Sequence, residues 1–433
     1  MKNNTFKLLA SLSLLAVITP LGVSAESLAG ADKDASADTS TPLAKRPSLF
    51  GGKGSPKEAL SEHGINLDLS YTRFGQGLYK GDTQHDFRSA GKVLAKLSID
   101  GAKLGLWNGF SISVIGEYND GNNQNGRAGM ILPVNTVMKF PVESGSGGDM
   151  SMTMTQRFGE KTSLTLGKFN MVEAASRTPL VGGGGIDTFW YLNPAAPISG
   201  LVPPYVTGAS LGVSTSLAQL SLMVFDPRGS QRVSGLDGWG DEGHTERLSA
   251  NFPIKPAGLD GNQVLTLAYT DRRGLDLGDL AYLLLPPSFQ VPVNDKKGGY
   301  LVTYAFQQYL FENTGESGAP EGWGVFGQIS KMDGNPTPYE WSGFLGIGGN
   351  SPLPGRSLDR WGLVTFNTRF SNDLSDSFAL LGANLGDERG SEAYYNLALT
   401  PWLRLAAHLQ YLQPADHDKS RVMLAGTSLQ IKF

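Results

Sequence analysis

Hydrophobic and polar residues alternate along most of the chain with the period of two that is typical of β-strands. In residues 402–411, leucines occupy alternate positions, and polar side chains, His408 among them, occupy the others. Residues 421–433 repeat the pattern, and the chain stops on the aromatic Phe433. Alternation over about ten residues with aromatics near the ends is typical of a strand between lipid and a wet lumen. Strands of soluble sandwiches also alternate, but they usually have about five or six residues.

The same alternation recurs from residue 65 onward and predicts about sixteen strands. The predicted strands are 65–74, 92–100, 110–118, 150–158, 162–169, 209–217, 219–226, 246–252, 263–270, 300–309, 322–330, 341–348, 359–370, 392–399, 402–411 and 421–433. Most long connections follow odd-numbered strands, whereas the shortest (159–161, 218 and 400–401) follow even-numbered ones. Short periplasmic turns and long external loops are the pattern of outer-membrane barrels. We therefore predict an all-β fold, a transmembrane antiparallel β-barrel with long external loops and both termini on the periplasmic side.

The first 25 residues have the features of a secretory signal peptide. Lys2 and Lys7 form the basic start, an apolar stretch broken by Pro20 follows, and a small-residue cleavage site ends at Ala25. Residues 26–49 are dominated by small and polar side chains with little to bury, which predicts a disordered leader. The barrel domain is then expected to span residues 50–433.

A short N-terminal helix is predicted just before the first strand. Ser55 can cap it, Pro56 suits its first position, Glu58 completes a capping box and Gly64 ends it. The helix would either brace the lumen or lie at the periplasmic rim.

Composition narrows the class of protein. The chain has 433 residues with 56 glycines, no cysteine, 18% charged residues and a formal net charge of −4. Such a fold closes without disulfides, and so small a charge gives no indication of a nucleic-acid partner. No segment after the signal offers the roughly 18 apolar residues of a transmembrane helix. An exported chain of this kind belongs in the periplasm or the outer membrane.

The longest connection, 170–208, carries the candidates for a pore constriction. These candidates are Arg177, Asp187, Phe189, Trp190 and Tyr191. A loop of this length is usually functional or disordered, and three adjacent aromatics argue against disorder. Folded inward, it would narrow the pore and present aromatic faces beside charged groups, a surface that suits sugars. The alternative is that the aromatics pack the external loops together or against a neighbouring subunit.

Charged side chains at the polar positions of the strands are predicted to face the lumen and to set a weak ion preference. They are Asp68, Lys92, Lys96, Arg157, Lys168 and Arg404. Each of them can equally form a structural salt bridge across the barrel wall.

Catalytic and metal-binding patterns are weak. Five histidines are scattered along the chain, and the acidic stretches 241–244 and 416–418 read as surface turns. Neither His-Glu-x-x-His nor Gly-x-Ser-x-Gly occurs. We expect no enzyme activity, no metal and no cofactor.

Three stretches carry a family resemblance: 57–72, 164–169 and 392–411. Over roughly residues 50–433 the chain resembles the carbohydrate-selective porins of Gram-negative outer membranes, the OprB family. The resemblance implies a sixteen-stranded barrel with passive, sugar-preferring diffusion, and Phe433 fits the export signal of such proteins. The lead before the first helix differs, since residues 50–54 read Phe-Gly-Gly-Lys-Gly where the family tends to have Gly-x-Trp-Gly-Gly.

We predict an outer-membrane porin through which mono- or oligosaccharides diffuse passively. Its expected partners are small neutral sugars, outer-membrane lipid and the barrel-assembly machinery, which would read the C-terminal strand ending in Phe433. The oligomeric state, monomer or trimer, stays open. The alternatives are a general porin or one that prefers organic acids or ions, and, in another class, a secreted soluble β-sandwich that binds sugars.

Overall fold

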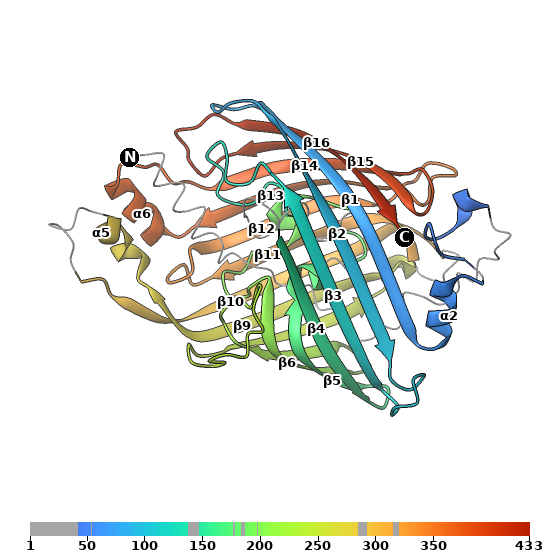
Figure 1. Ribbon diagram of the computed structural model, residues 1–433. Coiled ribbons are helices and arrows are strands. Elements are labelled where there is room, and N and C mark those ends of the chain that lie inside the picture. The colour runs from blue at the N-terminus through green and yellow to red at the C-terminus, as the bar shows by residue number, and fades with distance from the viewer. Residues whose placement is uncertain are drawn as a thin grey trace.

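A single closed sheet forms the body of the protein (Figure 1). The computed structural model describes residues 42–52, 54–136, 147–175, 178–182, 187–196, 198–284, 292–314 and 320–433. Each strand pairs antiparallel with its neighbours in the sequence, and β1 pairs with β16 to close the barrel. The predicted signal peptide and most of the predicted leader lie outside the described residues.

The strands are β1 (Ile65–Lys80), β2 (Phe87–Asp100), β3 (Phe110–Gly121), β4 (Gly147–Phe158), β5 (Thr162–Asn170), β6 (Tyr205–Ser214), β7 (Gln219–Phe225), β8 (Thr245–Ile254), β9 (Gly261–Leu275), β10 (Asp295–Thr314), β11 (Pro320–Met332), β12 (Tyr339–Asn350), β13 (Arg360–Phe370), β14 (Glu388–Ala398), β15 (Leu403–Gln413) and β16 (Val422–Lys432). The helices are α2 (Pro56–Glu62), α3 (Met171–Ala175), α4 (Leu192–Ala195), α5 (Leu280–Leu284) and α6 (Asn372–Leu380), with short 3-10 turns at η3 (Leu43–Lys45), η4 (Pro256–Gly258) and η5 (Leu277–Asp279). Within the described part of the chain, no helix has the length and hydrophobicity needed to span a membrane.

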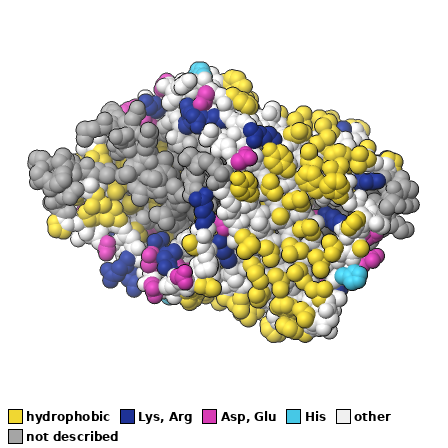
Figure 2. Space-filling model, in the orientation of Figure 1, with side chains coloured by type: hydrophobic (Ala, Val, Ile, Leu, Met, Phe, Trp, Pro, Cys, Tyr) yellow, Lys and Arg dark blue, Asp and Glu magenta, His cyan; other side chains and the backbone are white. Residues whose placement is uncertain are grey.

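The alternation of the sequence separates the two faces of the wall. Leu405 and Leu409 of β15 are 42% and 50% exposed, whereas His408 and Gln410 on the opposite face are buried. Apolar side chains gather over the outer face of β1 to β5 (Figure 2). The prediction of a sixteen-stranded barrel is confirmed, and the alternative of two stacked sheets is wrong because all strands belong to one closed sheet.

Two strands extend well beyond their predicted bounds. β1 continues to Lys80 through a glycine-rich stretch, and β10 runs for 20 residues. Register shifts in β10 lie between Lys297 and Gly299 and between Tyr309 and Phe311. Each shift inverts the parity of the residues beyond it, so a strict alternation count stops too early.

Helix α2 forms as predicted and lies at the periplasmic rim. The Ser55 side chain accepts a hydrogen bond from the Glu58 amide at 3.2 Å, and Pro56 is the first helical residue. None of its residues is buried, and Lys57 pairs with Asp68 at 2.6 Å. Figure 1 places α2 at the same end of the barrel as the C-terminus. The helix is therefore not a brace inside the lumen.

Candidate functional site

Two connections fold into the lumen and pack against one side of its wall. They are the residues that follow β3, of which 122–136 are described, and the connection between β5 and β6, residues 171–204. We call the second of these the inward loop; Figure 1 shows it in green within the ring of strands. Leu132, Trp190 and Leu192 expose none of their surface. Most buried apolar residues of both connections belong to one cluster with lumen-facing residues of the strands.

A buried glutamate on β14 fixes the middle of the inward loop. The amides of Trp190 and Tyr191 donate to the two carboxylate oxygens of Glu392, at 2.7 and 2.8 Å. His408 Nδ1 lies 3.0 Å from Oε1, and Gln410 Nε2 donates to Oε2 at 3.1 Å. Glu392 has no exposed surface, and its oxygens are satisfied by these donors.

A second glutamate, four residues earlier on the same face of β14, joins the two connections. The amides of Ile131 and Leu132 donate to Glu388 at 2.8 and 3.0 Å. The hydroxyl of Tyr191 donates to the same carboxylate at 2.7 Å. Glu388 and Glu392 together form what we call the carboxylate clamp. Its position means that both connections are held from one strand.

The three adjacent aromatics of the inward loop face the wall. The Trp190 ring stacks on His408 with centroids 3.7 Å apart, and Tyr191 stacks on Phe366 at 4.0 Å. Phe189 meets Tyr394 edge-on at 4.8 Å. All three loop aromatics are fully buried. They therefore hold the loop from behind and leave no ring face open to a permeant.

Glycines on the lumen face make room for these rings. A Cβ atom on Gly426 would collide with the Trp190 ring, and one on Gly362 would lie 2.6 Å from the Phe189 ring. Real Cβ contacts are not this short, so both positions depend on the absence of a side chain.

Asp187 ties the start of the described aromatic stretch to the last two strands. Its carboxylate lies 3.6 Å from Lys432 Nζ and 3.9 Å from Arg404 Nη1, and Asn396 donates to it at 3.1 Å. Burial alone would raise the pKa of Asp187, but the charges of Lys432, Arg404 and Arg360 outweigh it and lower the pKa from 3.8 to about 2. Asp187 and Arg404 are both candidates from the sequence, and the structure brings them together.

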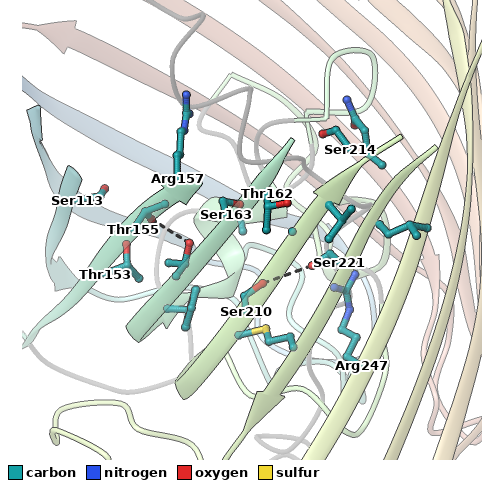
Figure 3. A pocket seen from close by; sticks show the side chains of 18 of the residues that line it. Ser113, Thr153, Thr155, Arg157, Thr162, Ser163, Ser210, Ser214, Ser221 and Arg247 are labelled. Carbon is teal, nitrogen blue, oxygen red and sulfur yellow. Dashed lines mark hydrogen bonds between the residues drawn. The ribbon is translucent and has the colours of Figure 1, made fainter. Parts of the chain in front are cut away.

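Among the described residues, the opposite side of the lumen is open. A cavity of about 510 Å³ extends along β3 to β8 and reaches α3 of the inward loop. Figure 3 shows its wall, which carries short hydroxyl side chains together with two arginines, Arg157 and Arg247. Thr155 bonds Thr165 at 2.9 Å and Ser210 lies 3.4 Å from Ser221, so hydroxyls pair across neighbouring strands. We call this surface the hydroxyl wall.

The remaining charges named from the sequence mostly have partners. Lys92 pairs with Glu117 at 3.1 Å, and Lys96 pairs with Glu173 of α3. Lys168 pairs with Asp149 at 2.8 Å and donates to the Val233 carbonyl. Asp68 reaches α2, as described above, and Arg157 lines the open cavity. Arg177 lies outside the described residues.

The carboxylate clamp escaped sequence analysis. Glu388 and Glu392 share the polar parity of β14, and Gln410 holds the position on β15 that faces Glu392, so a signal was present. A buried carboxylate needs donors, and here most of these donors are backbone amides of distant connections. Amides carry no sequence signature, and for that reason the partners could not be named.

The comparison with known proteins agrees with the barrel fold. A profile described as carbohydrate-selective porin, OprB family, matches residues 84–433. The chain belongs to the OprB family. As an OprB-family porin it is a carbohydrate channel of the Gram-negative outer membrane, and both family and fold are those of a channel rather than an enzyme.

Solved structures share the fold. The high-pH structure of Pseudomonas putida OprB is 17% identical, covers 90% of this chain and 99% of its own, and superposes with a TM-score of 0.76. The low-pH structure of the same protein is 15% identical over the same shares of the two chains, with a TM-score of 0.54. No curated protein sequence matched.

Proposed function

We propose that sugars cross along the hydroxyl wall, between β3 to β8 and the inward loop. The observation that carries the proposal is the open cavity of about 510 Å³ lined by serine and threonine with Arg157 and Arg247. Hydroxyl side chains both donate and accept, so they can replace the water around a sugar hydroxyl one bond at a time. Weak bonds of this kind let a permeant enter and leave, as conduction requires.

The constriction residues have indirect roles in this proposal. The inward loop is positioned by the packing of three of its rings, Phe189, Trp190 and Tyr191, against the barrel wall. Because these rings are buried, the permeant does not touch them. Asp187 and Arg404 place charge at the periplasmic part of that loop. Arg177 remains a candidate in the same connection.

The transport step is passive diffusion through water without covalent chemistry, metal or cofactor. We infer that the mature chain begins after Ala25 and that residues 50–433 form the porin domain. The assembly machinery of the outer membrane would read β16 and Phe433, and the barrel would stand in lipid as a monomer or trimer. Cross-linking of the protein in native membranes separates these two oligomeric states.

The test uses single channels in planar bilayers with added mono- and oligosaccharides. A sugar on the hydroxyl wall should lower the ion current, and the double variant Thr155→Val with Ser221→Ala should weaken this block. Each lost hydrogen bond to a neutral group corresponds to about 0.5–1.5 kcal/mol, or about a two- to tenfold weaker block. Thr427→Val, at an exposed position on the outer face of β16, is the matched control.

A preference for small organic acids is the second candidate, because Arg157 and Arg247 both line the cavity. Reversal potentials in a salt gradient measure it. Sugar block that is equal in the wild type and in the double variant would contradict the proposed path. Strong anion selectivity without any sugar block would favour the second candidate.

A further inference from the structure

The outer face of the barrel carries a groove over β12 to β16. It has a volume of about 450 Å³, and its lining includes Leu345, Thr365 and Ser391 with Arg389, Arg421 and Tyr411 at the edge. These side chains all sit at odd positions, the parity of the exposed Leu363 and Leu409. The groove therefore faces lipid and is separate from the lumen.

The groove lies where the apolar belt gives way to polar residues. Leu345, Leu363 and Leu409 are 56%, 52% and 50% exposed, and they lie on the periplasmic side of the two arginines. β14 and β15 are joined by a short turn at the periplasmic end, so Arg389 and Gln413 stand at their extracellular ends. This is the level at which the head groups of the outer leaflet meet the hydrocarbon.

The groove is cationic and partly preorganised. Its lining contains two arginines and no carboxylate. Arg421 lies 5.7 Å from the centre of the Tyr411 ring and donates to Gln413 Oε1 at 3.3 Å, which holds its guanidinium over the groove. Within the described residues, neither Arg389 nor Arg421 forms a salt bridge. A planar guanidinium beside hydroxyl and amide groups suits a phosphate attached to a sugar.

We propose that this groove binds a phosphorylated glycolipid of the outer leaflet. The phosphate lies between Arg389 and Arg421, the sugar of the head group meets Thr365 and Ser391, and an acyl chain runs over Leu345. Basic pockets at membrane interfaces hold anionic head groups in this way. The inference is independent of the permeant and of the path through the lumen.

The test is native mass spectrometry of the detergent-solubilised porin with added diphosphoryl lipid A. One lipid should remain bound to the wild type, and the apparent dissociation constant should rise about fivefold in Arg389→Gln and in Arg421→Gln. Arg73→Gln is the matched control, because Arg73 is an exposed arginine of β1 outside the groove. Heat-modifiable migration on gels shows that each variant is folded.

Lipid A without phosphates, inorganic phosphate and a zwitterionic lipid are the comparison probes. The proposal is supported if the wild type retains diphosphoryl lipid A but none of the comparison probes, and if binding weakens in both groove variants but not in Arg73→Gln. Equal retention of the phosphate-free lipid, equal loss in the Arg73 variant, or no change in the groove variants would overturn it. Binding of inorganic phosphate without retained lipid would also overturn it.

Discussion

The two sides of the lumen follow the same alternation of side chains but differ in what fills them. On the packed side, around β13 to β16 and β1, lumen positions carry Phe74, Phe366, Tyr394 and the carboxylate clamp, and the inward loop occupies the space. On the open side, along β3 to β8, the equivalent positions carry mostly serine and threonine. The position of a residue in the alternation therefore decides whether its side chain points to the lumen or to lipid. The size of a lumen-facing side chain, and whether it offers a carboxyl acceptor, decide whether a loop or water lies against it.

The difference has an energetic reason. A loop brought into the lumen buries backbone amides, which need acceptors. Glu388 and Glu392 supply acceptor oxygens for four such amides, and the buried aromatic rings of the loop add apolar contact with the wall. Serine and threonine on the other wall already bond one another across strands, which leaves them fewer acceptors for the amides of a loop.

The largest effect should come from removing the carboxylate clamp. Glu388→Gln with Glu392→Gln leaves buried loop amides without their acceptors, at a cost of about 1–3 kcal/mol for each unsatisfied group. The inward loop should leave the packed side, so that single-channel conductance rises while the barrel stays folded. Glu246→Gln, an exposed glutamate on β8, is the control and should conduct like the wild type. Unchanged conductance in the double variant would mean that the clamp does not position the loop.

A smaller effect is expected from a methyl group under the Trp190 ring. Gly426→Ala places a Cβ against that ring, and overpacking of this kind costs about 1–3 kcal/mol. Gly116→Ala is the matched change, because a Cβ there meets nothing within 4 Å. Thermal unfolding followed by circular dichroism should show a lower melting temperature for Gly426→Ala only. Equal melting temperatures would mean that the Trp190 seat is not tightly packed.

Acid should loosen the link between Asp187 and the last strands. Because its folded pKa is lowered from 3.8 to about 2, the contribution of Asp187 is present above pH 3.8 and is lost as the pH falls towards 2. Channel noise from loop motion should therefore increase between about pH 4 and 2. Asp187→Asn should show the increased noise already at neutral pH and little further change on acidification. A wild type that is equally quiet across this range would argue against the link.

The smallest effect should come from the one described ion pair between α3 and β2. Lys96→Gln removes the partner of Glu173 from the open side, and Lys96 is 37% exposed, so the expected loss is below about 1 kcal/mol. Conductance and melting temperature should stay close to the wild type. A large rise in conductance would mean that the loop is held from both sides, and the contrast between the two sides would then be weaker than proposed.

The sequence carried more of the fold than of the site. All sixteen strands and the rim helix followed from alternation and capping, because lipid and water impose a strict period of two. Strand ends were missed where bulges shift the parity, as in β10. Asp187 and Arg404 were named and lie close together, but the burial of Trp190 was not foreseeable. The Trp190 ring can pack against the wall because Gly426, far away in the sequence, has no side chain there. No local sequence pattern links these two residues.

The pairing of β1 with β16 has a consequence for damage near the end of the chain. Ser70 to Lys80 meet Met423 to Lys432 along the seam, and Phe433 donates its amide to the Leu69 carbonyl. β16 also pairs with β15. A chain cut before Val422 therefore leaves the edges of β1 and β15 without hydrogen-bond partners in hydrocarbon, where no water can replace them. A nonsense mutation at codon 422 should thus abolish the channel, whereas a deletion of the same length in an external loop leaves the ring intact.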